Sequence, residues 1–229
     1  MEKRMLLIKA CGVKGEEQEC KNVEIQAELY GIKTTVVAPK TVEELMAALK
    51  GKIKYDFIYL SSHGSAEGLC NHDSSIKLTW LDFGIMLCET ACMKENCILM
   101  LSCCRGGLNQ VAYDLIYCCE NISYVVGPRQ NLPAHDMLIS FNIFLYNVRH
   151  RGLDPIVACE KIKGGTDIRF VCFDRLEVEA EAGYILKQDD YREEMERRWR
   201  KMRGELEPPE EVKKLMEKKL SEPEVLPLN

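Results

Sequence analysis

Short hydrophobic runs alternate with longer amphipathic stretches along most of this chain. Six of the runs are rich in strand-favouring residues and predict β-strands, at Met5–Ala10, Thr34–Ala38, Tyr55–Leu60, Cys97–Ser102, Ile122–Val126 and Ile168–Phe173. The stretches between them predict helices, at Glu16–Tyr30, Val42–Leu49, Thr79 to about Cys92, Leu108–Cys119, Pro133 to about Arg149 and from Asp154 onward. The alternation predicts an α/β fold with a mainly parallel six-stranded sheet that helices cover on both faces.

Local signals mark several of the predicted boundaries. Thr41-Val-Glu-Glu44 is a capping box, in which the Thr and Glu side chains satisfy the first free N–H groups of a helix. Pro133 suits the start of a helix, and Asp136 then lies near its positive amino end. The segment Glu67–Thr79 is polar at its centre and apolar at its flanks, which predicts a small hairpin.

The composition changes after about residue 187, where about half of the residues are charged. We therefore predict two parts, a globular domain over 1–186 and a charged helical tail over 187–229. An apolar stripe recurs at helical spacing in the tail, at Tyr191, Met195, Trp199, Met202 and Leu206. This stripe suits either docking on the chain's own core or binding of a partner protein, and the sequence leaves both open.

Composition narrows the classes of function. Apolar residues make up 46% of the chain and charged residues 29%, which is typical of a globular protein. The net charge of -5 gives no support to nucleic-acid binding. No hydrophobic run approaches the roughly 18–20 residues that span a membrane, and the amino terminus lacks the length of a signal-peptide core. We therefore expect a cytosolic protein without membrane or nucleic-acid contacts.

The chain holds twelve cysteines, several of them inside hydrophobic runs. In a reducing compartment such cysteines behave as small core residues. A zinc site is the competing interpretation, but no pair has the C-x2-C spacing of a zinc finger or ribbon. We expect neither a metal nor a cofactor.

Two predicted strands end in residues that suit thiol catalysis. The strand Tyr55–Leu60 leads into His63-Gly64, and Cys97–Ser102 leads into Cys104-Arg105-Gly106. Because functional groups gather beyond the carboxyl ends of parallel strands, His63 and Cys104 are expected at one edge of the sheet. There a thiolate attacks a carbonyl while the imidazole moves protons. The N–H groups of Gly64 and Cys104 are candidates to stabilise the resulting oxyanion.

These two segments resemble the His and Cys elements of caspase-like cysteine peptidases, the group of caspases, metacaspases and separases. Cys104-Arg105-Gly106 matches the second half of the caspase signature Q-A-C-[RQG]-G. Ser102 and Cys103 replace its Gln and Ala, which is more similar to the CHAT branch, common in prokaryotic proteins. The resemblance extends over about Met5 to Phe173 and leaves out the tail.

The resemblance implies a cysteine endopeptidase that cleaves one or a few protein substrates with a His63/Cys104 dyad. Matching the motif selects Cys104 as nucleophile over its neighbour Cys103, which takes the position of the small residue. CHAT domains usually belong to longer proteins with sensing modules, so we expect a separate regulatory partner. Many prokaryotic relatives act in defence or programmed death. The alternatives are a catalytically silent interaction module and a different thiol enzyme on a flavodoxin-like sheet.

Substrate preference is less defined by the sequence. Arg105 and Arg129 are candidates to line a substrate pocket, and Arg129 would favour an acidic residue before the cleaved bond. The simpler interpretations are a brace for the active-site loop and a solvated loop arginine. Metacaspases carry an Asp two positions before the nucleophile, and here Ser102 takes that place. The other histidines are expected on loops or helix surfaces, at His72, His135 and His150.

Overall fold

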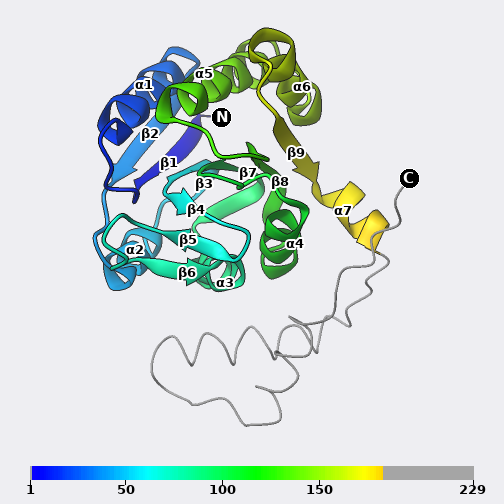
Figure 1. Ribbon diagram of the computed structural model, residues 1–229. Helices are drawn as coiled ribbons and strands as arrows, with labels where there is room; N and C mark the ends of the chain where they lie inside the picture. The colour runs from blue at the N-terminus through cyan, green and yellow to red at the C-terminus, as the bar shows by residue number, and fades with distance from the viewer. Residues whose placement is uncertain (1, 183–229) are drawn as a thin grey trace. The chain divides into compact units, whose positions relative to one another are not determined.

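The computed structural model describes residues 2–182 and contains a six-stranded central sheet in the order β2-β1-β3-β7-β8-β9 (Figure 1). The strands are Lys3–Lys9 (β1), Ile32–Val37 (β2), Tyr55–Ser61 (β3), Met93–Ser102 (β7), Ile122–Pro128 (β8) and Phe170–Asp174 (β9). All neighbouring pairs are parallel except β8 and β9, which are antiparallel. The predicted α/β class with a mainly parallel six-stranded sheet is confirmed.

Helices lie on both faces of this sheet. They are Glu16–Leu29 (α1), Val42–Leu49 (α2), Trp80–Thr90 (α3), Asn109–Cys118 (α4), Ala134–Leu145 (α5), Pro155–Thr166 (α6) and Arg175–Ala182 (α7). α1, α5 and α6 pack against one another on one face, whereas α3 packs against α2 and α4 on the other (Figure 1). The predicted coverage of both faces is confirmed, and it explains why the strands are hydrophobic on both sides.

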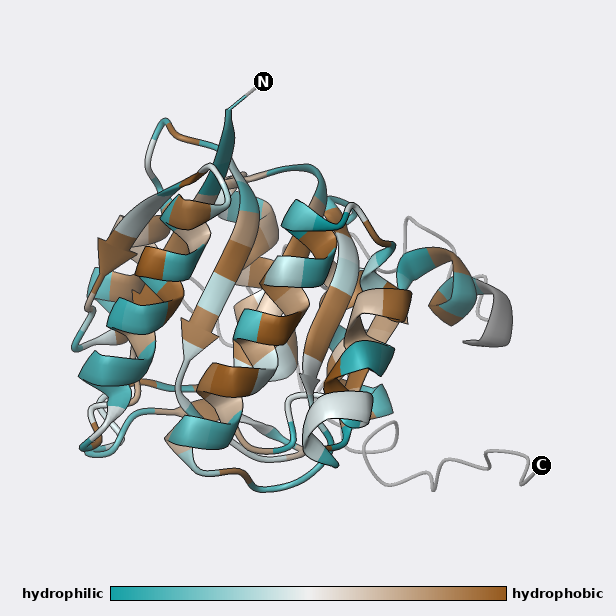
Figure 2. Cartoon of the chain, turned by 90° about the horizontal axis from the view of Figure 1, so that it is seen from above, coloured by the Kyte–Doolittle hydropathy of each residue, from teal (hydrophilic) through white to brown (hydrophobic). Residues whose placement is uncertain are grey.

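The core follows the alternation of side chains along each strand. Met5 and Leu7 of β1 belong to the hydrophobic cluster beneath α1 and α5, together with Phe141 of α5. Leu6 and Ile8, which point the other way, are also fully buried. Figure 2 shows hydrophobic residues recurring along the helices and in the strands behind them. Two hydrophobic layers therefore hold the sheet between the helices.

Side chains cap the starts of three helices, including the predicted cap at Thr41. The Thr41 hydroxyl accepts a hydrogen bond from the Glu44 N–H, and the Thr79 hydroxyl accepts one from the Asp82 N–H. The Asp154 carboxylate accepts one from the Ile156 N–H at the start of α6. Each bond satisfies one of the free N–H groups in a first helical turn. These helices therefore begin where the sequence predicts.

The expected hairpin is part of a second, smaller sheet. Its strands are His63–Gly64 (β4), Gly68–Cys70 (β5) and Lys77–Thr79 (β6), and both pairs are antiparallel. The hairpin of β5 and β6 is confirmed. The sequence did not predict β4, which draws the candidate histidine itself into regular structure.

Two predicted boundaries differ from the structure, one of a helix and one of a strand. The helix from Pro133 is α-helical only to Leu145 and continues as a π-helical turn over Tyr146–His150. The Asn147 side chain donates to the Ile143 carbonyl at 2.8 Å, a local bond that competes with regular helix geometry. The last strand begins at Phe170 rather than Ile168, because the Phe170 N–H donates to the Ile168 carbonyl in a tight turn.

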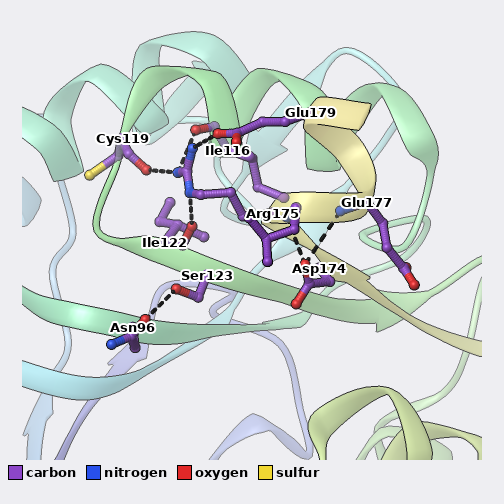
Figure 3. Close-up of polar contacts among 10 residues, drawn as sticks. Asn96, Ile116, Cys119, Ile122, Ser123, Asp174, Arg175, Glu177 and Glu179 are labelled. Carbon is purple, nitrogen blue, oxygen red and sulfur yellow. Dashed lines mark hydrogen bonds and ion pairs between the residues drawn. The ribbon is translucent and has the colours of Figure 1, made fainter. Parts of the chain in front are cut away.

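Helix α7 was not predicted and is held by one arginine (Figure 3). The Arg175 guanidinium donates to the carbonyls of Ile116 at 2.7 Å and of Cys119, at the end of α4. It also donates to the Ile122 carbonyl, at 2.9 Å, and pairs with Glu179 at 2.8 Å. Carbonyls at the end of a helix have no partner within the helix, so Arg175 joins α7 to α4 and to the start of β8.

The predicted tail over 187–229, with its apolar stripe, lies outside the described residues, and the boundary after residue 186 stays a prediction. Within residues 2–182, no helix combines the length and hydrophobicity needed to cross a membrane.

Candidate functional site

The strand register brings His63 and Cys104 to the same edge of the sheet. Ser61, the last residue of β3, pairs with Ser102, the last residue of β7. The Ser62 N–H then donates to the Ser102 carbonyl at 3.3 Å, beyond the strands. His63 and Cys104 each follow two residues after the paired serines. Neighbouring strands are about 4.8 Å apart, so the two predicted residues emerge side by side.

The direction of the chain connections reverses between β1 and β3, next to the β3–β7 pair that leads to the two candidate residues. From β1 the chain proceeds to β2 at one side, whereas from β3 it proceeds toward β7 and β8 at the other. Ligand sites of open parallel sheets lie beyond the carboxyl ends of the strands at such a reversal. The segments after β1 and β3 meet there, because the His72 N–H donates to the Cys11 carbonyl at 2.8 Å.

Gly64 touches the loop that carries Cys104. A Cβ atom at this position would lie 2.5 Å from the Cys104 carbonyl oxygen and 3.0 Å from the Cys103 sulfur. Both distances are shorter than carbon tolerates next to these atoms, so the close approach requires glycine. The contact locks the His-Gly segment against the Cys-Cys segment.

The two adjacent cysteines have different surroundings. Cys103 is only 1% exposed, and burial, followed by the neighbouring Cys104, raises its thiol pKa. Cys104 is partly exposed, and its sulfur lies 3.9 Å from the Leu132 carbonyl oxygen. A buried thiol that resists ionisation is a poor nucleophile. The surroundings therefore favour Cys104, in agreement with the motif.

The three residues that follow Cys104 have hydrogen-bonded backbone N–H groups. The amides of Arg105, Gly106 and Gly107 donate to the carbonyls of residues 130, 103 and 128, at 3.3, 3.2 and 2.8 Å. Within the described residues, the N–H of Cys104 has no acceptor. Arg105 has a φ of 62°, the left-handed value that a turn closed by Gly106 needs at its third position. Such strain concentrates at functional sites.

The N–H of Gly64 also points away from its own small sheet. The Ser65 N–H donates to the Gly68 carbonyl at 2.9 Å, and Gly64 pairs with Leu69. Because hydrogen-bonded and non-hydrogen-bonded pairs alternate in antiparallel strands, Gly64 falls at a position that makes no bond to β5. Both amides predicted for the oxyanion hole are thus free of strand pairing.

The imidazole of His63 is partly exposed, and its neighbour is a second histidine. The ring centroids of His63 and His72 lie 6.1 Å apart. In the described part of the chain, no carboxylate or carbonyl accepts a hydrogen bond from His63. The described residues therefore supply a His/Cys pair without a third, orienting carboxylate. His72 was expected on a surface loop; it is exposed there, but the fold brings it beside the candidate site.

The two arginines predicted to line a substrate pocket make different contacts. Arg105 is exposed, and its charge contributes, after the Ser65 hydroxyl, to lowering the pKa of Glu67 on the small sheet. Arg129 is exposed too, but its guanidinium donates to the Asn109 side chain at 2.7 Å and lies 6.0 Å from the Phe173 ring centroid. Arg129 therefore braces the start of α4, whereas the guanidinium of Arg105 forms no hydrogen bond within residues 2–182.

Two glutamates at the start of α1 complete this edge, and the sequence did not point to them. The Glu16 carboxylate accepts hydrogen bonds from the N–H groups of Cys11 at 2.8 Å and Gly12 at 2.7 Å. The Glu19 carboxylate accepts hydrogen bonds from the hydroxyls of Tyr59 and Ser102. The helical periodicity of α1 did indicate their burial. Glu16 and Glu19 lie at the three- and four-residue spacing of the apolar residues that α1 buries, and so share the buried face of the helix.

No metal-binding cluster is present in residues 2–182, where no three His, Cys, Asp or Glu side chains converge. The chain matches no protein-family model, and no curated protein is similar enough in sequence to be matched. The resemblance to caspase-like peptidases therefore rests on the sequence elements themselves and their order along the chain.

Proposed function

We propose that this chain is a cysteine endopeptidase of the caspase-like, CHAT type, with His63 and Cys104 as its catalytic dyad. The observation that carries the proposal is the contact of Gly64 with the Cys104 loop. It joins a partly exposed thiol, a neighbouring imidazole and two backbone amides without strand partners. These are the parts that acyl transfer to a thiol requires.

In the proposed first step, the Cys104 thiolate attacks the carbonyl carbon of the scissile peptide bond and forms a C–S bond. The carbonyl oxygen becomes an oxyanion, which accepts hydrogen bonds from the N–H groups of Gly64 and Cys104. The His63 imidazolium then gives its proton to the peptide nitrogen as the C–N bond breaks. The amine leaves, and the acyl group stays on the sulfur.

In the second step, a water molecule attacks the thioester carbon while neutral His63 accepts one of its protons. The C–S bond breaks as the new carboxyl group forms, and Cys104 departs as a thiolate beside the His63 imidazolium. This pair is the starting state, so the cycle consumes one peptide bond and one water. It needs neither a metal nor a cofactor.

The proposed substrate is one protein or a few, cut after a particular side chain. Arg105 is the better candidate for contacting it, since it is exposed beside Cys104, whereas Arg129 is engaged with Asn109. A cytosolic location belongs to the proposal, and its support is that none of the twelve cysteines, all of which lie within residues 2–182, forms a disulfide. A prokaryotic role in defence or programmed death, and control by a partner protein through 187–229, follow from the resemblance alone.

The test is peptide cleavage by the full chain. The wild type, Cys104→Ala, Cys103→Ala and His63→Ala are incubated with a proteome-derived peptide library, and new amino termini are identified by mass spectrometry. We expect cleavage by the wild type and by Cys103→Ala, and a loss of at least about a thousandfold in Cys104→Ala and His63→Ala. The residue before each new terminus reports the specificity, and Arg105→Ala is expected to broaden it.

Cleavage that persists in Cys104→Ala and disappears in Cys103→Ala would reverse the nucleophile. If no variant and no wild-type sample cleaves any peptide, and the Cys104 thiol reacts no faster than a free cysteine, the interaction module becomes the better hypothesis. Deletion of residues 187–229 tests the proposed regulation by a partner protein. This part of the proposal is wrong if the truncated chain folds, binds the same proteins and cleaves at the same rate.

A further inference from the structure

Glu19 is a buried carboxylate that the proposed reaction does not use. The residue is only 5% exposed, at the start of α1. Its Oε1 atom accepts a hydrogen bond from the Tyr59 hydroxyl at 2.6 Å and another from the Ser102 hydroxyl. A buried carboxylate is costly to keep, so its retention calls for a role.

The two hydroxyls belong to the strands that carry the dyad. Tyr59 lies on β3, four residues before His63, and Ser102 ends β7, two residues before Cys104. One oxygen atom of α1 therefore holds the carboxyl ends of both strands. Since His63 and Cys104 are separated from these anchors by very few residues, the anchors determine how the two loops leave the sheet.

Glu19 has no cation to neutralise it among residues 2–182. The titratable groups that face it are Glu16 and Cys20 of α1, Cys11 after β1, Tyr59 of β3 and Cys103 after β7. Burial raises the pKa of Glu19, whereas the Ser102 and Tyr59 hydroxyls lower it. Its negative charge also makes a small contribution to raising the pKa of Cys103, after burial, Cys104 and Cys11. The same carboxylate thus aligns the loops and disfavours ionisation of the wrong thiol.

We infer that Glu19 is a positioning residue, which holds the ends of β3 and β7 together through the Tyr59 and Ser102 hydroxyls and so sets His63 beside Cys104. This inference rests on the proposed function, because it assumes that His63 and Cys104 act as a pair. Glu19 touches neither substrate nor the reacting atoms.

The test measures thiol reactivity, which does not depend on finding a substrate. The full chain is treated with iodoacetamide from about pH 5 to about pH 9, and the alkylation of each cysteine is followed by mass spectrometry. His63→Ala defines the profile of Cys104 without the dyad. Glu19→Gln keeps the size of the side chain but removes its charge. Glu28→Gln is the matched control, since Glu28 is an exposed residue of the same helix.

We expect Glu19→Gln to move the alkylation profile of Cys104 toward that of His63→Ala, with about a tenfold lower rate near pH 6. Glu28→Gln is expected to retain the wild-type profile. Ser102→Ala and Tyr59→Phe each remove one hydroxyl and should shift the profile in the same direction. The double variant Glu19→Gln/Ser102→Ala should show less than the summed effect, because both changes weaken the same hydrogen bond between residues 19 and 102.

The outcomes separate the two proposals. If His63→Ala shifts the Cys104 profile but Glu19→Gln, Ser102→Ala and Tyr59→Phe do not, the positioning role is wrong and the dyad stands. If His63→Ala leaves the profile unchanged, there is no dyad to position, and both proposals fall. Should Glu19→Gln not fold, Ser102→Ala and Tyr59→Phe decide the question, and wild-type profiles in both would overturn the positioning role.

Discussion

Two carboxylates lie buried at opposite ends of the same strand pair, and their charges are handled differently. Asp56 near the start of β3 pairs with Lys3 at 2.8 Å and with Lys94 at 2.7 Å. Burial would raise its pKa, but the hydrogen bonds from the two lysines and a backbone amide leave it lowered. Glu19 at the other end receives only neutral hydroxyls, and its pKa is raised. The buried charge of Asp56 is therefore neutralised by lysines, whereas the buried carboxyl group of Glu19 is held by neutral donors.

The same contrast extends to the loops. At the amino end of the sheet, Arg175 satisfies three backbone carbonyls around the end of α4 and the start of β8 (Figure 3). At the carboxyl end, the N–H of Cys104 lacks an acceptor within residues 2–182, and Arg105 holds a strained φ. Satisfied groups stabilise a fold, whereas unsatisfied and strained groups are typical of functional sites. The comparison therefore supports the proposed placement of the functional site at the carboxyl end of this sheet.

The largest expected effect on stability is at Gly64. Gly64→Ala forces a Cβ to within 2.5 Å of the Cys104 carbonyl oxygen, and a backbone oxygen cannot retreat as a flexible side chain does. We expect a loss of about 2–3 kcal/mol in the free energy of unfolding, together with slower alkylation of Cys104. Chemical denaturation and iodoacetamide labelling measure the two effects.

Gly164 of α6 is the matched control for this change, because no atom lies within 4 Å of a Cβ built there. Gly164→Ala should be neutral or stabilise the helix by about 0.5–1 kcal/mol. Equal losses of stability in the two variants would show that the contact at Gly64 is not tight.

A smaller loss of stability is expected from a change at the amino end of the sheet. Arg175→Ala removes the donors of three carbonyl groups and should cost about 1–3 kcal/mol in the free energy of unfolding, without altering the Cys104 alkylation profile. Arg175→Lys should recover only part of the loss, since a single ammonium lacks the planar fork of the guanidinium. A changed Cys104 profile would break the separation of the two ends. Denaturation curves and labelling of the same samples give both values.

Asp56 is expected to contribute stability that disappears in acid. A carboxylate whose folded pKa is lowered stabilises the protein above its unfolded pKa, about 3.9, and loses that contribution as the pH falls through the folded pKa. The wild type should therefore exceed Asp56→Asn by about 1–3 kcal/mol at neutral pH, and by less below about pH 4. Urea unfolding at a series of pH values tests this. A difference that stays constant through this range would contradict it.

The smallest effect, and one of opposite sign, is expected at Glu19. A carboxyl group whose folded pKa is raised costs stability as the pH rises from its unfolded pKa of about 4.3 through the folded pKa. The stability of Glu19→Gln relative to the wild type should therefore increase over this interval, whatever its absolute value. The change of stability with pH is modest, because the hydrogen bonds from the Tyr59 and Ser102 hydroxyls offset part of the rise in pKa that burial causes. The same urea series measures it, and parallel slopes for Asp56→Asn and Glu19→Gln would remove the contrast between the two ends.

The local parts of this protein were predictable from its sequence. Hydrophobic runs located the six strands to within a few residues, because strands covered by helices on both faces bury mainly hydrophobic side chains. Caps such as Thr41 and Thr79 marked helix starts, since their hydroxyls act within three residues of the chain. The positions of His63 and Cys104 after two such strands followed from the same pattern.

Only the tertiary structure decided how these parts meet. The register that pairs Ser61 with Ser102, the closeness of Gly64 to Cys104, and the burial of Cys103 all depend on segments about 40 residues apart. Glu19 looked like an ordinary helix residue, and Arg175 lay in a stretch that predicted no element. Both act on groups more than 50 residues away, in addition to the nearer contacts of Glu19 with Tyr59 and of Arg175 with Glu179. Local propensity reports what a few neighbouring residues prefer, whereas these contacts exist only after the sheet has formed.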